Sequence, residues 1–383
     1  MRAGWHIKPL GSLCDILDNQ RKPITKRDRI AGDYPYYGAT GILDFVAGFL
    51  FDEPLVLVGE DGAKWASGEN TAFSIEGKCW VNNHAHVLRP HRAEIADSWL
   101  IHFLVHFDLS EFVSGLTVPK LNQGSLREIP IPVPPLPEQQ RIVGILDEAF
   151  DGIATAKANA EQNLQNARAL FESHLQSVFT QRGEGWVEKR IEEIGTTQTG
   201  STPKTSDKKN FGDFIPFIKP ADFNADGSLN YENDGLSEQG FAQARKVAEG
   251  SVLMVCIGAT IGKCGWCDRD ITTNQQTNTL TPTKGASYKF IYYQMLIEDF
   301  QRRVIHCSGQ ATLPIINKSK WSALTVWLPP TLDDQEQIVA KLDALREETQ
   351  RLESLYQRKL AALDELKKSL LHQAFSGQLI RDN

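Results

Sequence analysis

The chain has 383 residues, 41% hydrophobic and 23% charged, a composition typical of a globular protein with two or three domains. No run of 18 or more apolar residues occurs, and the start of the chain lacks the apolar segment of a secretory signal, so we expect a cytoplasmic protein with no membrane segment. Six scattered cysteines fit a reducing compartment. The net charge of -7 argues mildly against a stand-alone DNA-binding protein, although local basic clusters matter more than the total.

The sequence consists of two copies of one unit. Gly4-Trp5 recurs as Gly185-Trp186, 181 positions later (185 − 4). Further landmarks follow in the same order in both copies: the apolar segments 55–59 and 253–258, the polar segments 81–85 and 273–277, and the segments 131–143 and 326–339. At the last landmark the offset is 196 (338 − 142), so the second copy carries net insertions.

Each copy is predicted to contain a globular part and a long helix. In 1–135 and 183–330, short apolar runs alternate with Gly, Pro and Asn, a pattern that predicts a β-rich fold with some helix. Prolines at 130–137 and 329–330 end these parts, because proline continues neither a helix nor a central strand. Helices are therefore expected in 136–182 and 331–383.

Both predicted helices carry apolar residues at steps of three and four, the pattern of a coiled-coil seam. About 40 residues at about 1.5 Å each give a length of roughly 60 Å. The two helices can bury their seams against each other, and a hairpin that only spaces two domains stays open as an interpretation. The seam residues are Ile142, Leu146, Ile153, Leu164 and Phe171 in the first helix, and Ile338, Leu342, Leu345, Leu352, Leu363, Leu366 and Leu370 in the second.

Cys264 and Cys267 have the spacing of a redox dithiol or of half a zinc site. A zinc site needs four ligands, and His306-Cys307 is the nearest candidate for the rest. The flanks of the cysteine pair suggest a hairpin rather than the strand–helix context of redox motifs. A structural role is favoured, with metal binding and redox activity as alternatives.

Other motifs resemble catalytic sites only loosely. The segment 258–263 has three residues between its glycines, where a phosphate-binding loop has four. Asp61 with 76–78 loosely resembles the carboxylate–lysine set of a nuclease, but these residues lie in turn-like sequence. His84 and His86 have no carboxylate or third metal ligand nearby in the sequence. No Asn/Asp-Pro-Pro-Tyr/Phe run and no glycine-rich cofactor loop after a strand is present, so methyl transfer would require a partner.

The segment 134–143, Pro-Pro-Leu-Pro-Glu-Gln-Gln-Arg-Ile-Val, leads into a long helix within a repeated unit. This pattern resembles the specificity subunit of type I restriction–modification enzymes. The resemblance implies an α+β fold: target-recognition domains 1–135 and 183–330, of mixed α/β structure, joined by two helices, 136–182 and 331–383, that form an antiparallel coiled coil with pseudo-two-fold symmetry. The second helix entry, 330–336, departs from the family's pattern.

By this resemblance the chain is a non-catalytic subunit. Each domain would read one half of an asymmetric bipartite site in double-stranded DNA, and the helices would set the spacing and dock methyltransferase subunits, two being expected. A restriction or motor subunit would complete the complex. S-adenosylmethionine, ATP and magnesium are expected on those partners and none on this chain. The alternatives are the specificity subunit of a combined methylase–nuclease system and a coiled-coil scaffold without DNA readout.

Lysine and arginine position a protein on phosphates, whereas Asn, Gln and Arg specify bases. Gln275 and Gln276 have a structural alternative, as amides that complete a turn. Residue type and nearness to the repeated landmarks give these candidate DNA contacts: Arg21, Lys22, Lys64, Lys120, Asn122 and Gln123 in the first domain, and Lys204, Lys219, Lys263, Gln275, Gln276, Gln310 and Lys318 in the second.

Overall fold

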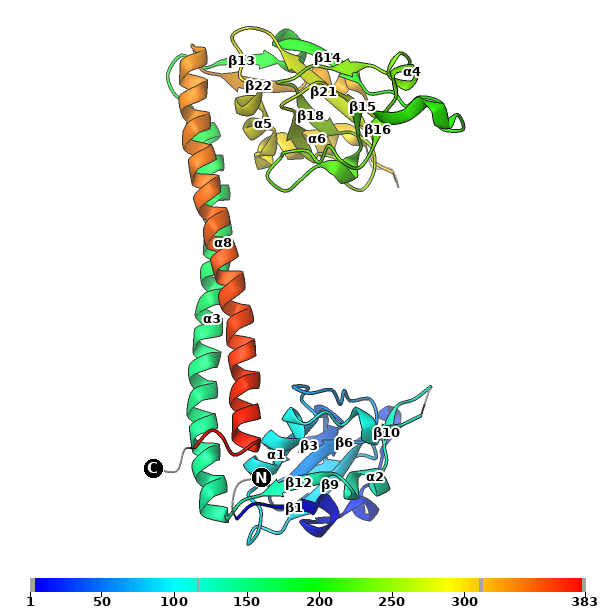
Figure 1. The fold of residues 1–383 in the computed structure, drawn as a ribbon, viewed down its shortest axis with the longest axis vertical. Coiled ribbons are helices and arrows are strands. Elements are labelled where there is room, and N and C mark those ends of the chain that lie inside the picture. The colour runs from blue at the N-terminus through cyan, green and yellow to red at the C-terminus, as the bar shows by residue number, and fades with distance from the viewer. Residues whose placement is uncertain (1–3, 116, 310–312, 381–383) are drawn as a thin grey trace. The chain divides into compact units, whose positions relative to one another are not determined.

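The computed structural model describes residues 4–115, 117–309 and 313–380, which form two compact units. Unit 1 comprises 1–162 and 356–383, and unit 2 comprises 163–355. Each unit contains one globular domain and a part of both long helices, α3 (Leu136–Gln181) and α8 (Leu332–Phe375), drawn in green and in orange to red in Figure 1. Among the described residues, no helix is both long and apolar enough to cross a membrane.

The globular domain of unit 1 is built on two four-stranded sheets. One sheet is antiparallel, with the order β2 (Cys14–Ile16), β9 (Ala85–Pro90), β6 (Leu55–Gly59), β7 (Ala72–Ile75). The other has the order β4 (Gly41–Val46), β3 (Ala31–Gly38), β8 (Lys78–Val81), β5 (Phe51–Asp52), with β3 and β8 parallel. The remaining elements are β1 (His6–Pro9) paired with β12 (Pro130–Val133), β10 (Val113–Ser114) paired with β11 (Lys120–Leu121), α1 (Asp97–His106) and α2 (Gln123–Arg127).

Unit 2 repeats this topology. Its antiparallel sheet has the order β14 (Gly195–Thr199), β21 (Thr277–Pro282), β18 (Val252–Val255), β19 (Cys264–Trp266). The second sheet has the order β16 (Gly235–Leu236), β15 (Phe211–Ile218), β20 (Ile271–Thr273), β17 (Lys246–Val247), with β15 and β20 parallel. The other elements are β13 (Val187–Arg190) paired with β22 (Thr325–Leu328), α4 (Glu238–Phe241), α5 (Tyr288–Leu296), α6 (Glu298–Ser308) and α7 (Lys318–Ser322). The predicted fold class, two mixed α/β domains in an internal repeat with two long helices, is confirmed.

A buried glutamine near the start of each long helix fastens that helix to its domain. The Gln139 side chain accepts a hydrogen bond from the Ala96 N–H (2.9 Å) and donates to the carbonyl oxygens of Glu94 (2.8 Å) and Pro134 (2.9 Å). The Gln335 side chain accepts from the Ser287 N–H (2.8 Å) and donates to the Gly285 carbonyl (3.0 Å).

The two glutamines are separated by 196 positions (335 − 139), the offset found in the sequence, and they are 0% and 1% exposed. Because a buried backbone group that loses its partner costs about 1–3 kcal/mol, these amides favour one docking geometry for each helix.

The seam residues near the start of each helix pack on the globular domains. Ile142 and Leu146 lie in the core of unit 1, together with Leu371 of α8. Leu342 lies in the core of unit 2, with Phe171 and Ile338 packed against that core. Ile153 is also buried, and the remaining predicted seam residues Leu164, Leu345, Leu352, Leu363 and Leu370 are partly buried. Leu366 is 47% exposed, so its prediction as a seam residue is wrong; α8 turns this side chain to solvent.

Two ion pairs show that α3 and α8 run antiparallel. In unit 1, Lys157 Nζ lies 2.7 Å from Asp364 Oδ1, and in unit 2, Arg168 Nε lies 2.9 Å from Glu353 Oε2. The residue numbers of each pair add to 521 (157 + 364 and 168 + 353), so the residue number falls along α8 as it rises along α3. The helices therefore have the same antiparallel register in both units.

Candidate nucleic-acid interface

In each unit, two loops meet at the residue that follows the central strand of the antiparallel sheet. In unit 1 this residue is Glu60: its N–H donates to the His84 carbonyl (2.9 Å), and its carbonyl accepts from the Leu121 N–H (2.8 Å). The turn 82–84 and the segment 120–123 therefore lie side by side. We call the surface formed by these two loops edge 1.

Unit 2 contains the same arrangement around Cys256. The Cys256 N–H donates to the Gln276 carbonyl (2.7 Å), and the Cys256 carbonyl accepts from the Ile316 N–H (3.0 Å). The turn 274–276 and the segment 315–318 therefore lie together, and we call their surface edge 2. Matching backbone bonds make edge 1 and edge 2 equivalent places in the repeat.

Asparagines shape the two turns in the same way. The Asn82 Oδ1 accepts from the His84 N–H (2.8 Å), and the Asn274 Oδ1 accepts from the Gln276 N–H (3.1 Å). Such side-chain-to-backbone bonds hold a turn without help from a sheet. The residues that directly follow these asparagines, Asn83 and Gln275, are exposed. Exposed amides on rigid turns offer the paired donor and acceptor that base edges require.

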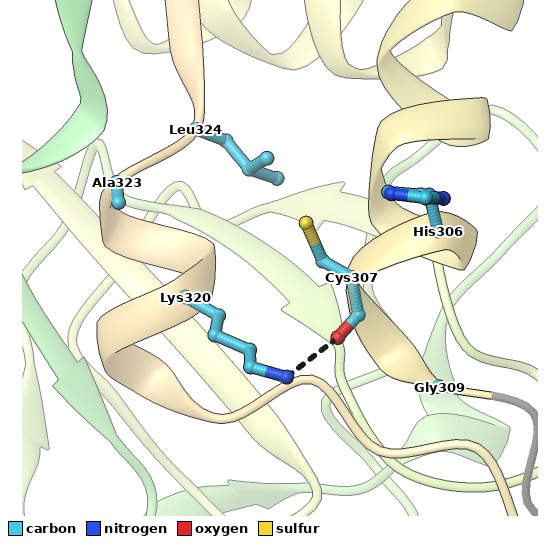
Figure 2. A pocket seen from close by; sticks show the side chains of 6 residues that line it. All are labelled: His306, Cys307, Gly309, Lys320, Ala323 and Leu324. Carbon is cyan, nitrogen blue, oxygen red and sulfur yellow. Dashed lines mark hydrogen bonds between the residues drawn. The ribbon is translucent and has the colours of Figure 1, made fainter.

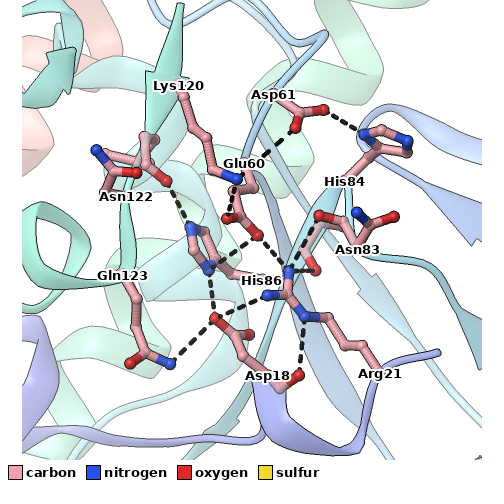
Figure 3. A network of polar contacts seen from close by, with 12 residues as sticks. Asp18, Arg21, Glu60, Asp61, Asn83, His84, His86, Lys120, Asn122 and Gln123 are labelled. Carbon is pink, nitrogen blue, oxygen red and sulfur yellow. Dashed lines mark hydrogen bonds and ion pairs between the residues drawn. The ribbon is translucent and has the colours of Figure 1, made fainter. Parts of the chain in front are cut away.

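Several predicted DNA contacts gather on these edges. Lys120, Asn122 and Gln123 lie on edge 1 (Figure 3). Gln275, Gln276 and Lys318 lie on edge 2, where Thr202 Oγ1 donates to Gln275 Oε1 (2.5 Å). The Gln276 side-chain oxygen accepts a hydrogen bond from Asn274 Nδ2 (2.9 Å) within the turn, as the structural alternative expected, whereas the Gln275 side chain is exposed.

The other candidates belong to neither of the two loops that form each edge. Lys22 and Lys204 are exposed, as is Lys64, whose side chain is 80% exposed. Lys219 forms an ion pair with Asp234 (2.7 Å), and Lys263 is half-buried in the 258–263 loop. Gln310 lies outside the described residues.

Sequence reasoning missed three exposed polar residues on the edges. His84 is 50% exposed at its side chain and pairs with Asp61. Asn83 and Asn317 are exposed as well, and the Asn317 Oδ1 caps α7 by accepting from the Lys320 N–H (2.9 Å). The repeat itself carried the signal, because Asn83 aligns with Gln275 and Asn317 aligns with Asn122.

A buried charged network supports edge 1 from beneath (Figure 3). The fully buried His86 places Nδ1 2.6 Å from Asp18 Oδ2 and Nε2 2.7 Å from the Leu121 carbonyl. Both neighbours are acceptors, so the geometry fits a ring that donates from both nitrogens. Burial acts to raise the pKa of the Asp18 carboxyl, but its hydrogen bonds to His86 and to the Val87 N–H outweigh burial and hold that pKa below its usual value.

Arg21 belongs to the same network. Its guanidinium, 11% exposed at the side chain, forms ion pairs with Glu60 and Asp18 and donates to the Ala85 carbonyl (2.7 Å). Lys120 Nζ reaches Glu60 Oε1 at 2.8 Å. Asp18, Glu60 and His86 lie close enough together to hold a metal ion, but a cation there would have to displace the Arg21 and Lys120 charges. This network therefore fits a rigid support for edge 1 better than a metal site.

Edge 2 has a neutral counterpart to this network. Strand register aligns Asn278 with His86, because His86 pairs with Val58 on β6 and Asn278 pairs with Met254 on β18. Thr199 Oγ1 donates to Asn278 Oδ1 at 2.7 Å. One scaffold thus carries charged support in unit 1 and neutral support in unit 2.

The cysteines of unit 2 are buried free thiols. Burial raises the pKa of Cys267 to about 11 and also raises the pKa of Cys264, so neither thiol is activated as a nucleophile. His306 and Cys307 instead line a separate cavity of about 460 Å³ with Lys320 and Leu324 (Figure 2). The three-residue metal-compatible group found among the described residues contains none of these cysteines. This packing favours the structural interpretation of Cys264 and Cys267.

Comparison with known proteins defines the family. The model of the type I restriction modification DNA specificity domain matches residues 2–166 and 183–360. These two matches cover most of the chain, which therefore belongs to this family and carries its domain twice.

Relatives agree with this assignment. The protein designated S.HindORF215P of Haemophilus influenzae, described as a type I restriction enzyme specificity subunit, is 41% identical over 143 residues, 37% of this chain and 36% of the relative. The type I restriction enzyme HindI specificity subunit of the same organism is 29% identical over 149 residues, 38% of this chain and 32% of the relative. The chain thus aligns with about a third of the length of each.

Among solved structures, a chain from work described as the structural basis underlying complex assembly and conformational transition of the type I R-M system has a similar fold. Its TM-score is 0.71 at 19% identity, with 99% of both chains covered. At this identity the similarity shows the fold alone.

Proposed function

We propose that this chain is the DNA-sequence-specificity subunit of a type I restriction–modification complex, in which edge 1 and edge 2 each read one half of a bipartite site. The observation that carries this proposal is the pair of equivalent edges. Each is fixed by the same backbone bonds, yet each presents different polar side chains. A shared scaffold with different side chains is what reading two different half-sites requires.

The chemistry of the edges suits base readout. Gln123 and Asn122 on edge 1, and Gln275 on edge 2, are exposed amides, a type that pairs with adenine through one donor and one acceptor. Lys318 is an exposed cation that fits guanine acceptors or a backbone phosphate. The half-sites read by the two edges should therefore differ, which makes the whole site asymmetric.

Partners supply the chemistry in this proposal. Methyltransferase subunits, two in number, dock on α3 and α8, and a restriction or motor subunit joins them. S-adenosylmethionine, ATP and magnesium bind to those subunits, and this chain takes no catalytic part. The family assignment and the high thiol pKa values of unit 2 support this division of roles.

The test is methylome sequencing of cells that express this chain with its neighbouring methyltransferase gene. We expect one asymmetric bipartite motif with adenine methylated in both halves. Gln123→Ala should relax or abolish selection in one half-site only, and Lys318→Ala should affect the other. Glu76→Ala serves as the control and should leave the motif intact, because Glu76 is exposed and follows the end of β7 that pairs with Leu55, whereas edge 1 lies beyond Gly59 at the other end of β6.

The remaining candidates give different results. A scaffold without DNA readout gives no methylated motif when both proteins are expressed and soluble, and that result would sink the proposal. The specificity subunit of a combined methylase–nuclease would give a motif but would require no separate restriction subunit for cleavage. A redox role for Cys264 and Cys267 predicts thiol-exchange activity, lost when both become alanine, whereas our proposal predicts an unchanged motif in that variant.

A further inference from the structure

The contacts between α3 and α8 occur in repeated sets. The ion pairs Lys157–Asp364 and Arg168–Glu353 occupy equivalent places, because subtracting the repeat offset of 196 from 364 and 353 gives 168 and 157. In both pairs α3 supplies the cation and α8 supplies the anion.

A second set of contacts follows the same rule. The Lys367 ammonium lies 5.1 Å from the Phe150 ring centre in unit 1, and the Arg346 guanidinium lies 4.5 Å from the Phe171 ring centre in unit 2. Subtracting 196 from 367 and 346 gives 171 and 150, so these contacts are also repeat equivalents. Here α3 supplies both aromatic rings and α8 supplies both cations.

From these complementary roles we infer that α3 and α8 form a heterospecific pair, in which each helix fits the other and rejects a second copy of itself. Two α3 helices in this register would bring Lys157 against Arg168 of the other copy twice. Two α8 helices would bring Glu353 against Asp364, and Arg346 against Lys367. Charges beside a helix seam select partners by such repulsion as well as by attraction.

One consequence concerns assembly. Two copies of the first half of this chain, made without the second half, should not pair with each other through α3. This inference rests on the helix contacts and holds whether or not the edges read DNA.

The test gives α8 the charges of α3 within the full chain. Glu353→Lys with Asp364→Lys sets a cation against Lys157 and another against Arg168, and we expect the urea midpoint of unfolding to fall. The loss should shrink at high salt, because salt screens exposed charges. Adding Lys157→Glu and Arg168→Glu restores two opposite-charge pairs with reversed sense and should recover most of the loss.

A matched control separates pairing from net charge. Glu348→Lys with Glu365→Lys on α8 makes the same change, from -7 to -3 (−7 + 4), but breaks only the pairs with Arg351 and Lys368 within that helix. This control should lose much less stability. An equal fall in the urea midpoint of the two double variants would overturn the inference. A fourfold variant whose urea midpoint does not recover, or that does not fold, would also overturn it.

Discussion

At the scale of single residues, burial separates the polar groups that hold the domain from those that face outward. His86 is fully buried between two acceptors, whereas Gln123, on the neighbouring loop, is exposed and reaches Asp18 Oδ2 at 3.2 Å. Arg21 and Lys120 satisfy buried carboxylates, so part of the positive charge in unit 1 is already neutralised within the domain. The proposed phosphate contacts would then depend more on exposed cations such as Lys22 and Lys64.

Replacing His86 tests the buried network. His86→Leu removes the donor to both Asp18 and the Leu121 carbonyl, and breaking a buried charge pair costs about 3–5 kcal/mol. We expect the urea midpoint of unit 1 to fall while unit 2 stays intact. Asn278→Leu at the equivalent position of unit 2 is the comparison, and it should cost less because no charge is involved. An equal fall in the urea midpoint for His86→Leu and Asn278→Leu would contradict a stabilising charge in the unit 1 network.

The Asp18 pKa makes a second prediction, on acid stability. Its folded-state pKa lies below its unfolded value, so ionised Asp18 stabilises the fold at pH above the usual aspartate pKa of about 4. That contribution is lost as the pH falls through the folded-state pKa. Asp18→Asn should be less stable than the parent at pH 7, and the difference should narrow in acid. A difference that stays constant down to pH 2 would contradict this account.

At the scale of elements, the entry of each long helix is fixed by one buried amide. Gln139→Leu and Gln335→Leu each leave buried backbone groups without partners, at about 1–3 kcal/mol per group. Hydrogen exchange should show faster opening at the start of α3 in the first variant and at the start of α8 in the second. Gln337, exposed two residues after Gln335, provides the control through Gln337→Leu. Faster hydrogen exchange in the Gln337→Leu variant alone would show that the two buried amides do not dock the helices.

Sequence periodicity predicted both helices but not all of their neighbours. Steps of three and four identified Ile142 and Leu342 as inward-facing, yet these side chains pack into the globular cores. The same steps included Leu366, which is exposed. Periodicity fixes which side of a helix is apolar, but the element that covers that side depends on tertiary contacts.

At the scale of the whole molecule, the net charge is -7, so the proposed DNA binding has to rely on local exposed cations, and each cation that contacts a phosphate adds to its dependence on salt. For the complex with its methyltransferase, the logarithm of the DNA-binding constant should fall linearly with the logarithm of salt concentration. Lys64→Ala should make the slope shallower by about one unit if Lys64 contacts phosphate, at every DNA sequence tested. Binding that does not respond to salt would exclude phosphate contacts and favour the scaffold.

The sequence by itself determined the repeat, the two long helices and the family, because these depend on patterns that run along the chain. The offset of 196 found near Ile142 and Ile338 also relates the docking glutamines. Only the tertiary structure decided which polar residues share an edge and which are buried. Arg21 and Lys22 are neighbours of the same charge class, yet Arg21 lies among carboxylates and Lys22 faces solvent. That difference arises from segments far apart in sequence, Asp18 with Glu60 and His86, whose proximity is created by strand pairing.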